Sequence, residues 1–314
     1  MRALVEAFTR DAPKVSVVMA TYNRGGVLPY SIGSVLRQSF ADFELLVVGD
    51  GCTDDSAEVV AAIGDRRIRW IGLERNSGHQ SEPNNAGLEA ARGEIVAYLG
   101  HDDLWLPDHL ADLVAAIEAG ADMAHAAIYW PPAPGETARI SALNPYLPGS
   151  AIPPSAVAHR RAIVARSGGW RHFRQTVGWP ETDLWARFHA CGLAIVAVPN
   201  LSVIKISGGS RRDVYKDRPS HEQAHWFERI GQESDLATKL PLEVIAATTR
   251  PSEMRYVDLI RQFVTQTRDR LARRLKGGYK MGGPGEAVSR LRRFKGLGEV
   301  PPECGPGLSL GGDK

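Results

Sequence analysis

Short apolar runs rich in β-branched residues alternate with segments of helical spacing over the first 130 residues of the chain. The runs that we predict as strands cover residues 15–21, 43–49, 68–72, 94–100 and 122–130. Helical segments lie between them, and the connections are short. This order is typical of an α/β fold with a Rossmann-like, mostly parallel central sheet and helices on both faces.

Polar residues follow four of the predicted strands. Thr21, Asp50, Asn76 and Asp102 each come at or just after a strand end. Ligands of open parallel sheets bind beyond the carboxyl ends of the strands. We therefore expect these four side chains to converge on one ligand site at that edge.

Asp102 and Asp103 follow the apolar run 94–100 directly. Two adjacent carboxylates at the end of a buried strand repel each other and lose hydration, and something must offset that cost. Oxygen ligands of this kind suit Mg²⁺ or Mn²⁺. The alternative is that one aspartate caps the helix that Pro107 helps to start, and the pattern leaves both readings open.

Positive charge is concentrated near the C-terminus. The whole chain has a formal net charge of +2, yet residues 268–295 contain ten Lys and Arg against Asp269 and Glu286. Such a segment can dock weakly on an anionic membrane surface or remain a solvated tail. Cys52, Cys191 and Cys304 are widely spaced and suggest no disulfide framework. Because no membrane span or signal peptide is evident, we expect a cytoplasmic protein, peripheral at most at the inner membrane face.

The second half of the chain is harder to assign. We expect a loop over residues 131–158, a helix over 180–192, strands over 193–198 and 201–206, and helices over 222–240 and 253–276. The last fifteen residues have a composition typical of disorder. We predict an N-terminal extension (1–13), an α/β half (14–130), a second half (131–220), a C-terminal helical extension (221–276) and a basic, partly disordered tail rich in Gly and Pro (277–314).

Several short motifs follow one another in a defined order along the chain. They are VSVVMATYNR (15–24), VVGDGCTDDS (47–56), NSG (76–78) with NNAG (84–87), LGHDDLW (99–105) and ETDLW (181–185). Together they resemble the ordered motifs of family 2 glycosyltransferases, over about residues 14–210. The resemblance implies a GT-A fold, in which residues 14–130 bind a nucleotide sugar and residues 131–220 bind the acceptor. It also implies an inverting transfer from a UDP- or dTDP-sugar to a hydroxyl of a glycan or a small molecule.

The resemblance also implies roles for single residues. Thr21 and Tyr22 would lie beside the base and ribose, and Asp50 would accept from the imide N–H of uracil or thymine. Asp102 would hold a divalent metal, Mn²⁺ or Mg²⁺, that bridges the two phosphates. As strand-end turns and helix caps, these residues also have an ordinary structural explanation. The remaining residues assigned to the nucleotide-sugar site are Arg24, Asn76, Asn85, His101 and Asp103.

Glu181 is the candidate general base, since the reaction needs a carboxylate to take the proton of the attacking hydroxyl. Asp183, the second acidic residue of this motif, would cap or brace the helix near the catalytic group. The alternative is that Pro-Glu-Thr-Asp simply starts a helix, because a helix N-terminus prefers these residues.

Three departures from the family pattern affect the metal more than the fold. Gly100 replaces the first residue of the usual Asp-x-Asp motif, which leaves His101 as a substitute ligand or ribose contact. Gly49 replaces an acid before Asp50, and Ser207 stands where many members have a histidine. Lys205, Arg211 and Arg212 are alternative phosphate partners. Two other functions stay open: a sugar nucleotidyltransferase, or a non-catalytic relative that binds a nucleotide sugar or glycan.

Overall fold

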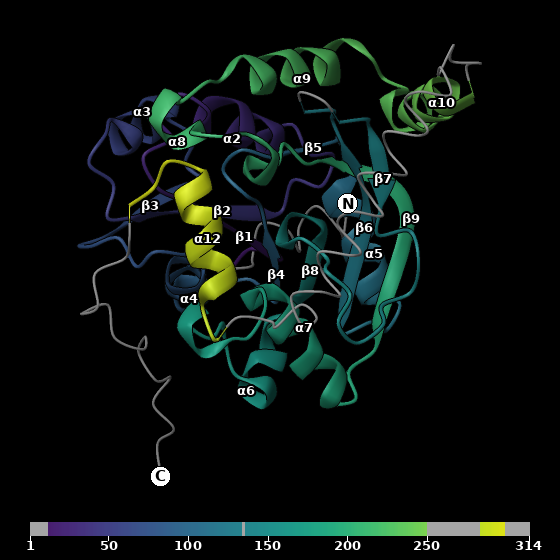
Figure 1. The fold of residues 1–314 in the computed structure, drawn as a ribbon. Helices are drawn as coiled ribbons and strands as arrows, with labels where there is room; N and C mark the ends of the chain where they lie inside the picture. The colour runs from purple at the N-terminus through teal and green to yellow at the C-terminus, as the bar shows by residue number, and fades with distance from the viewer. Residues whose placement is uncertain (1–11, 134–135, 250–282, 299–314) are drawn as a thin grey trace, which may run out of the picture.

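Parallel strands form the N-terminal half of the sheet, as the sequence predicts. They are β1 (Val15–Thr21), β2 (Phe43–Asp50), β3 (Ile68–Leu73) and β4 (Ile95–Tyr98), in the spatial order β3-β2-β1-β4 (Figure 1). All of β2 and nearly all of β1 is buried, as expected for strands covered on both faces. Helices α2 (Leu28–Leu36) and α3 (Ser56–Ile63) lie on one face, and α4 (Ser81–Ala90) packs on β1 and β2 from the other.

The computed structural model describes residues 12–133, 136–249 and 283–298. Within them the sheet has nine strands and continues from β4 in the order β8-β6-β9-β5. Here β8 (Val157–Arg160) is antiparallel to both of its neighbours, β4 and β6 (Met123–Trp130), and β9 (Ile195–Ile204) is parallel to β6. Two short antiparallel strands complete the sheet, β5 (Leu104–Trp105) beside β9 and β7 (Arg139–Ser141) beside β6.

The remaining helices surround this sheet. They are α5 (His109–Glu118), α6 (Val164–Ser167), α7 (Pro180–Ala190), α8 (Val214–Asp217), α9 (His221–Gln232), α10 (Leu236–Thr249) and α12 (Glu286–Phe294). Short 3₁₀ turns occur at 154–156, 161–163, 173–175 and 208–210. The main hydrophobic core lies between the sheet and the helices that cover it. A second apolar cluster lies between β9, α9 and α10. The predicted α/β fold is confirmed.

Three predictions about the second half need correction. The strands expected at 193–198 and 201–206 form one strand, β9, in which Pro199 and Asn200 are taken up by a bulge opposite β6. The helix expected over 222–240 is broken between α9 and α10 at residues 233–235, where Ser234 and Asp235 favour helix starts over helix interiors. The loop expected over 131–158 contributes β7 and the start of β8 to the sheet.

One part of the basic tail lies within the described residues. Residues 283–298 form α12 and its flanking turns, and the yellow helix lies across the sheet beside α4 (Figure 1). The expected helix over 253–276 and the last fifteen residues lie outside the described residues. In the part that is described, no helix is long and apolar enough to cross a membrane.

The contact between α4 and β1 depends on Gly87. A Cβ atom at this position would lie 2.3 Å from Cγ1 of the buried Val18, well inside van der Waals contact. Gly87→Ala should therefore lower the thermal midpoint by about 2–4 °C or more, because overpacking costs about 1–3 kcal/mol and exceeds the gain in helix propensity. Differential scanning calorimetry measures this shift.

Gly231→Ala in α9 is the matched control. Its added Cβ would meet only the guanidinium end of Arg37, at 3.0 Å, and that side chain can move. The control should be neutral or slightly stabilising. Equal losses in the two variants would show that the α4 contact has no special role.

Candidate functional site

A cavity of about 660 Å³ lies beyond the carboxyl ends of β1, β2 and β4, within the size range of small-molecule sites. It brings together most of the residues that the sequence assigned to a site. Its lining includes Thr21, Tyr22, Asp50, Asn76, His101, Asp102 and Glu181. Four of the predicted site residues do not line it, namely Arg24, Asn85, Asp103 and Asp183.

Asp50 is held at the end of β2 by the turn that follows β3. Its carboxylate accepts hydrogen bonds from the Asn76 amide (2.9 Å) and from the Ser77 backbone N–H (2.9 Å). Gly51 has a φ of +67°, and a Cβ there would lie 2.3 Å from the Asn76 nitrogen, so a glycine is needed for this approach. Burial raises the pKa of Asp50 to about 6, although the hydrogen bonds from Ser77 oppose that shift.

Thr21 and Tyr22 lie at the end of β1, which flanks β2 on the side away from β3. The Thr21 hydroxyl oxygen is buried at the cavity wall and has no hydrogen-bond partner among the described residues. The Tyr22 ring lies 6.5 Å from the ring of Tyr215, which comes from α8 in the second half of the chain.

His101 is fully occupied by protein partners. Its Nδ1 lies 3.2 Å from the Ala20 carbonyl oxygen and its Nε2 lies 3.1 Å from the Tyr215 hydroxyl. Because a carbonyl can only accept, Nδ1 carries the proton and Nε2 accepts from the tyrosine. Burial lowers the pKa of His101 to about 4, so the ring is neutral at pH 7. The structure therefore places His101 at the cavity but leaves neither nitrogen free to replace the missing metal ligand.

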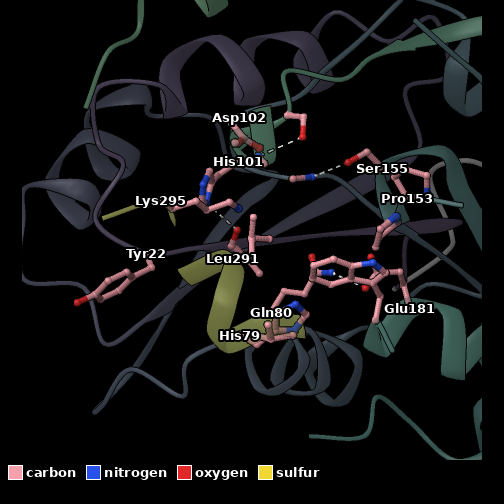
Figure 2. A pocket seen from close by; sticks show the side chains of 18 of the residues that line it. Tyr22, His79, Gln80, His101, Asp102, Pro153, Ser155, Glu181, Leu291 and Lys295 are labelled. Carbon is pink, nitrogen blue, oxygen red and sulfur yellow. Dashed lines mark hydrogen bonds between the residues drawn. The ribbon is translucent and has the colours of Figure 1, made fainter. Parts of the chain in front are cut away.

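Asp102 and Asp103 have different environments despite their adjacency. Asp102 lines the cavity (Figure 2). Burial alone would raise its pKa, but the positive charge of His101 in its protonated form and the ammonium groups of Lys205 and Lys295 hold the pKa of Asp102 below its usual range. Asp103 is 0% exposed and points inward. It accepts from the Ser155 hydroxyl, from Lys205 Nζ (2.6 Å) and from the Ile206 backbone N–H (3.1 Å).

Asp103 thus joins the second half of the chain to the end of β4. The sequence assigned Asp103 to the nucleotide-sugar site, but the structure shows that it does not line the cavity. The described residues contain no group of three or more His, Cys, Asp or Glu arranged to hold a metal. Mg²⁺ is, however, commonly bound through one or two carboxylates with substrate phosphates and water. Asp102 fits that arrangement, in which a ligand would supply the other oxygens.

Glu181 reaches the cavity from the first turn of α7 (Figure 2). Gln80 Nε2 lies 3.4 Å from its Oε2. Burial raises the pKa of Glu181, with Lys205 and Gln80 acting in the opposite direction. A carboxylate with a raised pKa in a cleft is a candidate for general base catalysis. Asp183 lies outside the cavity, where it pairs with Arg171 (3.2 Å) and Arg187 (2.9 Å).

Arg24 and Asn85 position loops near the cavity. The buried Arg24 guanidinium donates to the carbonyl oxygens of Val214 (2.8 Å) and Pro219 (3.2 Å). The Asn85 side chain makes two 2.8 Å hydrogen bonds to the backbone of Trp170. Both residues therefore brace segments of the second half against the first half of the chain.

Of the alternative phosphate partners, only Lys205 lines the cavity, together with Ser207. Arg211 is paired with Glu222, and Arg212 lies over the Phe294 ring at 5.8 Å. Sequence reasoning missed several lining residues: Gln80, Trp130, Arg139, Trp179, Tyr215 and the inner face of α12. The helical spacing of apolar and basic residues in α12 was visible in the sequence, but nothing local indicates where that helix packs.

Comparisons with known proteins agree with these motifs. Residues 16–153 match the family model described as glycosyl transferase family 2. The chain is 40% identical over 113 residues to the succinoglycan biosynthesis protein ExoO of Rhizobium meliloti (strain 1021), covering 36% of this chain and 32% of that protein. It is 38% identical over 104 residues to the poly(ribitol-phosphate) beta-N-acetylglucosaminyltransferase TarP of Staphylococcus aureus (strain N315), covering 32% of each. The matches thus span about a third of these relatives.

The fold extends beyond the family model. The structure of S. aureus TarS in complex with UDP-GlcNAc superposes with a TM-score of 0.52 and 19% identity, over 77% of this chain and 75% of that one. At this identity the likeness concerns the fold alone. It places both halves of the sheet in a GT-A-like architecture.

The buried Asp103 generates a stability prediction. Asp103→Asn removes the charge that compensates the Lys205 ammonium, so the free energy of unfolding should fall by about 2–4 kcal/mol. Chemical denaturation followed by tryptophan fluorescence measures the change. Asp183→Asn is the control, because its arginine partners are partly exposed and its loss should cost at most about 1 kcal/mol. Similar losses in both variants would contradict a joining role for Asp103.

Proposed function

This chain belongs to the family 2 glycosyltransferases, and we propose that it transfers a sugar from a UDP- or dTDP-sugar to an acceptor hydroxyl with inversion. One observation carries the proposal. Glu181, a half-buried carboxylate with a raised pKa, lines the same cavity as Thr21, Asp50 and Asp102, and it comes from the second half of the chain. The proposed base and the proposed nucleotide-binding edge would then face each other across one space.

The nucleotide would bind against the carboxyl ends of β1 and β2. Asp50 would accept from the imide N–H of the base, a contact that favours uracil or thymine over cytosine. Thr21 and Tyr22, which both line the cavity, would lie beside the base and ribose. This arrangement supports residues 14–130 as the donor-binding half.

The acceptor would enter from the side of β6 and α7. Trp130 and Trp179 line this part of the cavity, and their rings offer apolar surface for the C–H face of a sugar. Trp130 is held by a 2.7 Å hydrogen bond to the Ser141 hydroxyl and by the Arg139 guanidinium, 4.1 Å from its ring centroid. These features support residues 131–220 as the acceptor-binding half and favour a carbohydrate acceptor.

In the proposed reaction, the Glu181 carboxylate takes the proton of the acceptor hydroxyl as its oxygen attacks the anomeric carbon. The bond to the nucleoside diphosphate breaks on the opposite face, so the configuration inverts. A divalent metal held by Asp102, when bound, would neutralise charge that develops on the leaving diphosphate. Burial makes Glu181 a stronger base than an exposed glutamate, and Gln80 orients it.

Glu181→Gln tests the base directly. The amide keeps the size of the side chain but cannot take a proton, so turnover should fall by about 10²–10⁴ while donor binding is preserved. Release of nucleoside diphosphate from a panel of UDP- and dTDP-sugars, with a panel of sugar acceptors, measures turnover. Asp183→Asn is the control and should keep most of the activity. A larger loss in Asp183→Asn than in Glu181→Gln would assign the base to Asp183.

Asp50 predicts how binding of a UDP-sugar depends on pH. The ionised carboxylate is the strong acceptor for the imide N–H, whereas the protonated form accepts weakly and adds an O–H donor; the pKa of Asp50 is about 6 in the free protein. The affinity should therefore be constant well above pH 6 and fall roughly tenfold by pH 5 as the carboxylate is protonated. Isothermal titration calorimetry measures it, with a UDP-sugar as ligand because its diphosphodiester does not titrate in this range.

A CDP-sugar with the same sugar is the matched control. Its cytosine N3 is an acceptor, so protonation of Asp50 should not weaken its binding and can strengthen it. A parallel decrease for both ligands, or no change for the UDP-sugar, would contradict the proposed contact between Asp50 and the base.

A further inference from the structure

One face of α12 closes the cavity on the side of the strand ends. Val288, Leu291, Arg292 and Lys295 all line the cavity, at the i, i+3, i+4 and i+7 spacing of a single helix face. Val288 is only 1% exposed. Residues on the outer face, among them Arg290 and Arg293, are exposed. The basic residues of α12 and its C-terminal end therefore lie on two faces, one exposed to solvent and one that lines the cavity.

Helix α12 is fixed to both halves of the molecule. Arg292 donates to the Gly78 carbonyl oxygen at 2.6 Å, in the turn that also holds Asp50. The carbonyl oxygens of Phe294 and Lys295 each accept at 3.0 Å, from the backbone N–H groups of Asp213 and Tyr215. These contacts place the helix between the nucleotide edge and the segment that follows β9.

Lys295 brings into this site a positive charge for which the structure shows no ion pair among the described residues. Gly208 leaves room for its stem, since a Cβ there would lie 2.9 Å from Lys295 Cε. Among the described residues, no carboxylate oxygen lies within 4 Å of its Nζ, whose nearest aromatic ring, Tyr215, is centred 5.7 Å away. Burial lowers the pKa of Lys295. A partly desolvated ammonium that faces a cavity is stabilised by an anion bound there.

The surrounding charges indicate where that anion would lie. Lys295 and Lys205 both act electrostatically on Asp102, the residue proposed to hold a metal. The cavity therefore offers one carboxylate for a metal and two ammonium groups close to it. A diphosphate is the part of a nucleotide sugar that this charge pattern suits.

We propose that Lys295 is a diphosphate-binding residue, and that α12 forms part of the donor site together with the strand ends. This inference rests on the proposed function. In it, Lys295 contacts a phosphate oxygen and Arg292 holds α12 on the 76–78 turn. The basic tail then contributes to binding the donor and stabilising the leaving group, in addition to any role of its outer face.

The test compares ligands that differ only in the diphosphate. UDP and uridine are titrated into the full chain and into Lys295→Gln by calorimetry or ligand-observed NMR, at neutral pH, with Mn²⁺ and with EDTA. The dTDP and thymidine pair is measured in the same way. Lys295→Gln should weaken the diphosphate about 10–100-fold and leave the nucleoside unchanged, in both metal conditions. Arg290→Gln, on the outer face of the same helix, should change neither.

Hydrogen exchange of the wild-type chain provides a second measurement that needs no variant. UDP should slow amide exchange in residues 286–297, and uridine should not. Equal weakening of UDP and uridine in Lys295→Gln would show a purely structural role, and unchanged UDP affinity would remove the contact. Faster exchange with UDP would mean that the ligand expels α12, which also overturns the proposal. If the wild type binds no nucleoside diphosphate, the proposed function fails as well.

Discussion

A single buried carboxylate joins the two halves of this protein at the cavity. Asp103 follows β4, yet its three partners are Ser155, before β8, and Lys205 and Ile206, after β9. Removing one partner of such a network leaves a buried charge uncompensated, so the network holds only as a whole. The position of Asp102 toward the cavity follows from the inward position of Asp103. The residue next to the proposed metal ligand therefore helps to fix the proposed donor and acceptor sides relative to each other, together with Arg24, Asn85 and the pairing of β8 with β4.

The Asp102-Asp103 pair shows how two like residues acquire different properties. Both are desolvated, but burial dominates for Asp103 and raises its pKa, whereas surrounding positive groups dominate for Asp102 and lower its pKa. Asp102 is thus ionised and available to a cation, and the same cations that stabilise it also attract phosphate. Lys205 forms an ion pair with Asp103 and also lines the cavity. The same ammonium group therefore stabilises the buried carboxylate and contributes positive charge to the proposed ligand site.

The sequence predicted what depends on local patterns and on the geometry of parallel sheets. The strand ends at Thr21, Asp50 and Asp102 converge because parallel strands share a carboxyl edge, and Glu181 reaches the same cavity from the first turn of a helix that Pro180 starts. Which of two adjacent aspartates points inward could not be read, since it depends on residues 155 and 205. The insertion of β8 between β4 and β6, and the packing of α12, depend likewise on contacts between segments far apart in the chain.

The dependence of α12 on these distant contacts has a functional consequence. A nine-residue helix is not stable alone in water, so α12 is held by its docking: the burial of Val288, the Arg292 bond to Gly78 and the backbone bonds to Asp213 and Tyr215. These contacts connect the Asp50 turn to the loop after β9 through one element. A ligand that bridges Lys295 and the strand ends would add to the same docking free energy. By linkage, whatever holds α12 in place strengthens ligand binding by the same factor as the ligand strengthens docking. Helix docking and donor binding are thus expected to be one coupled equilibrium.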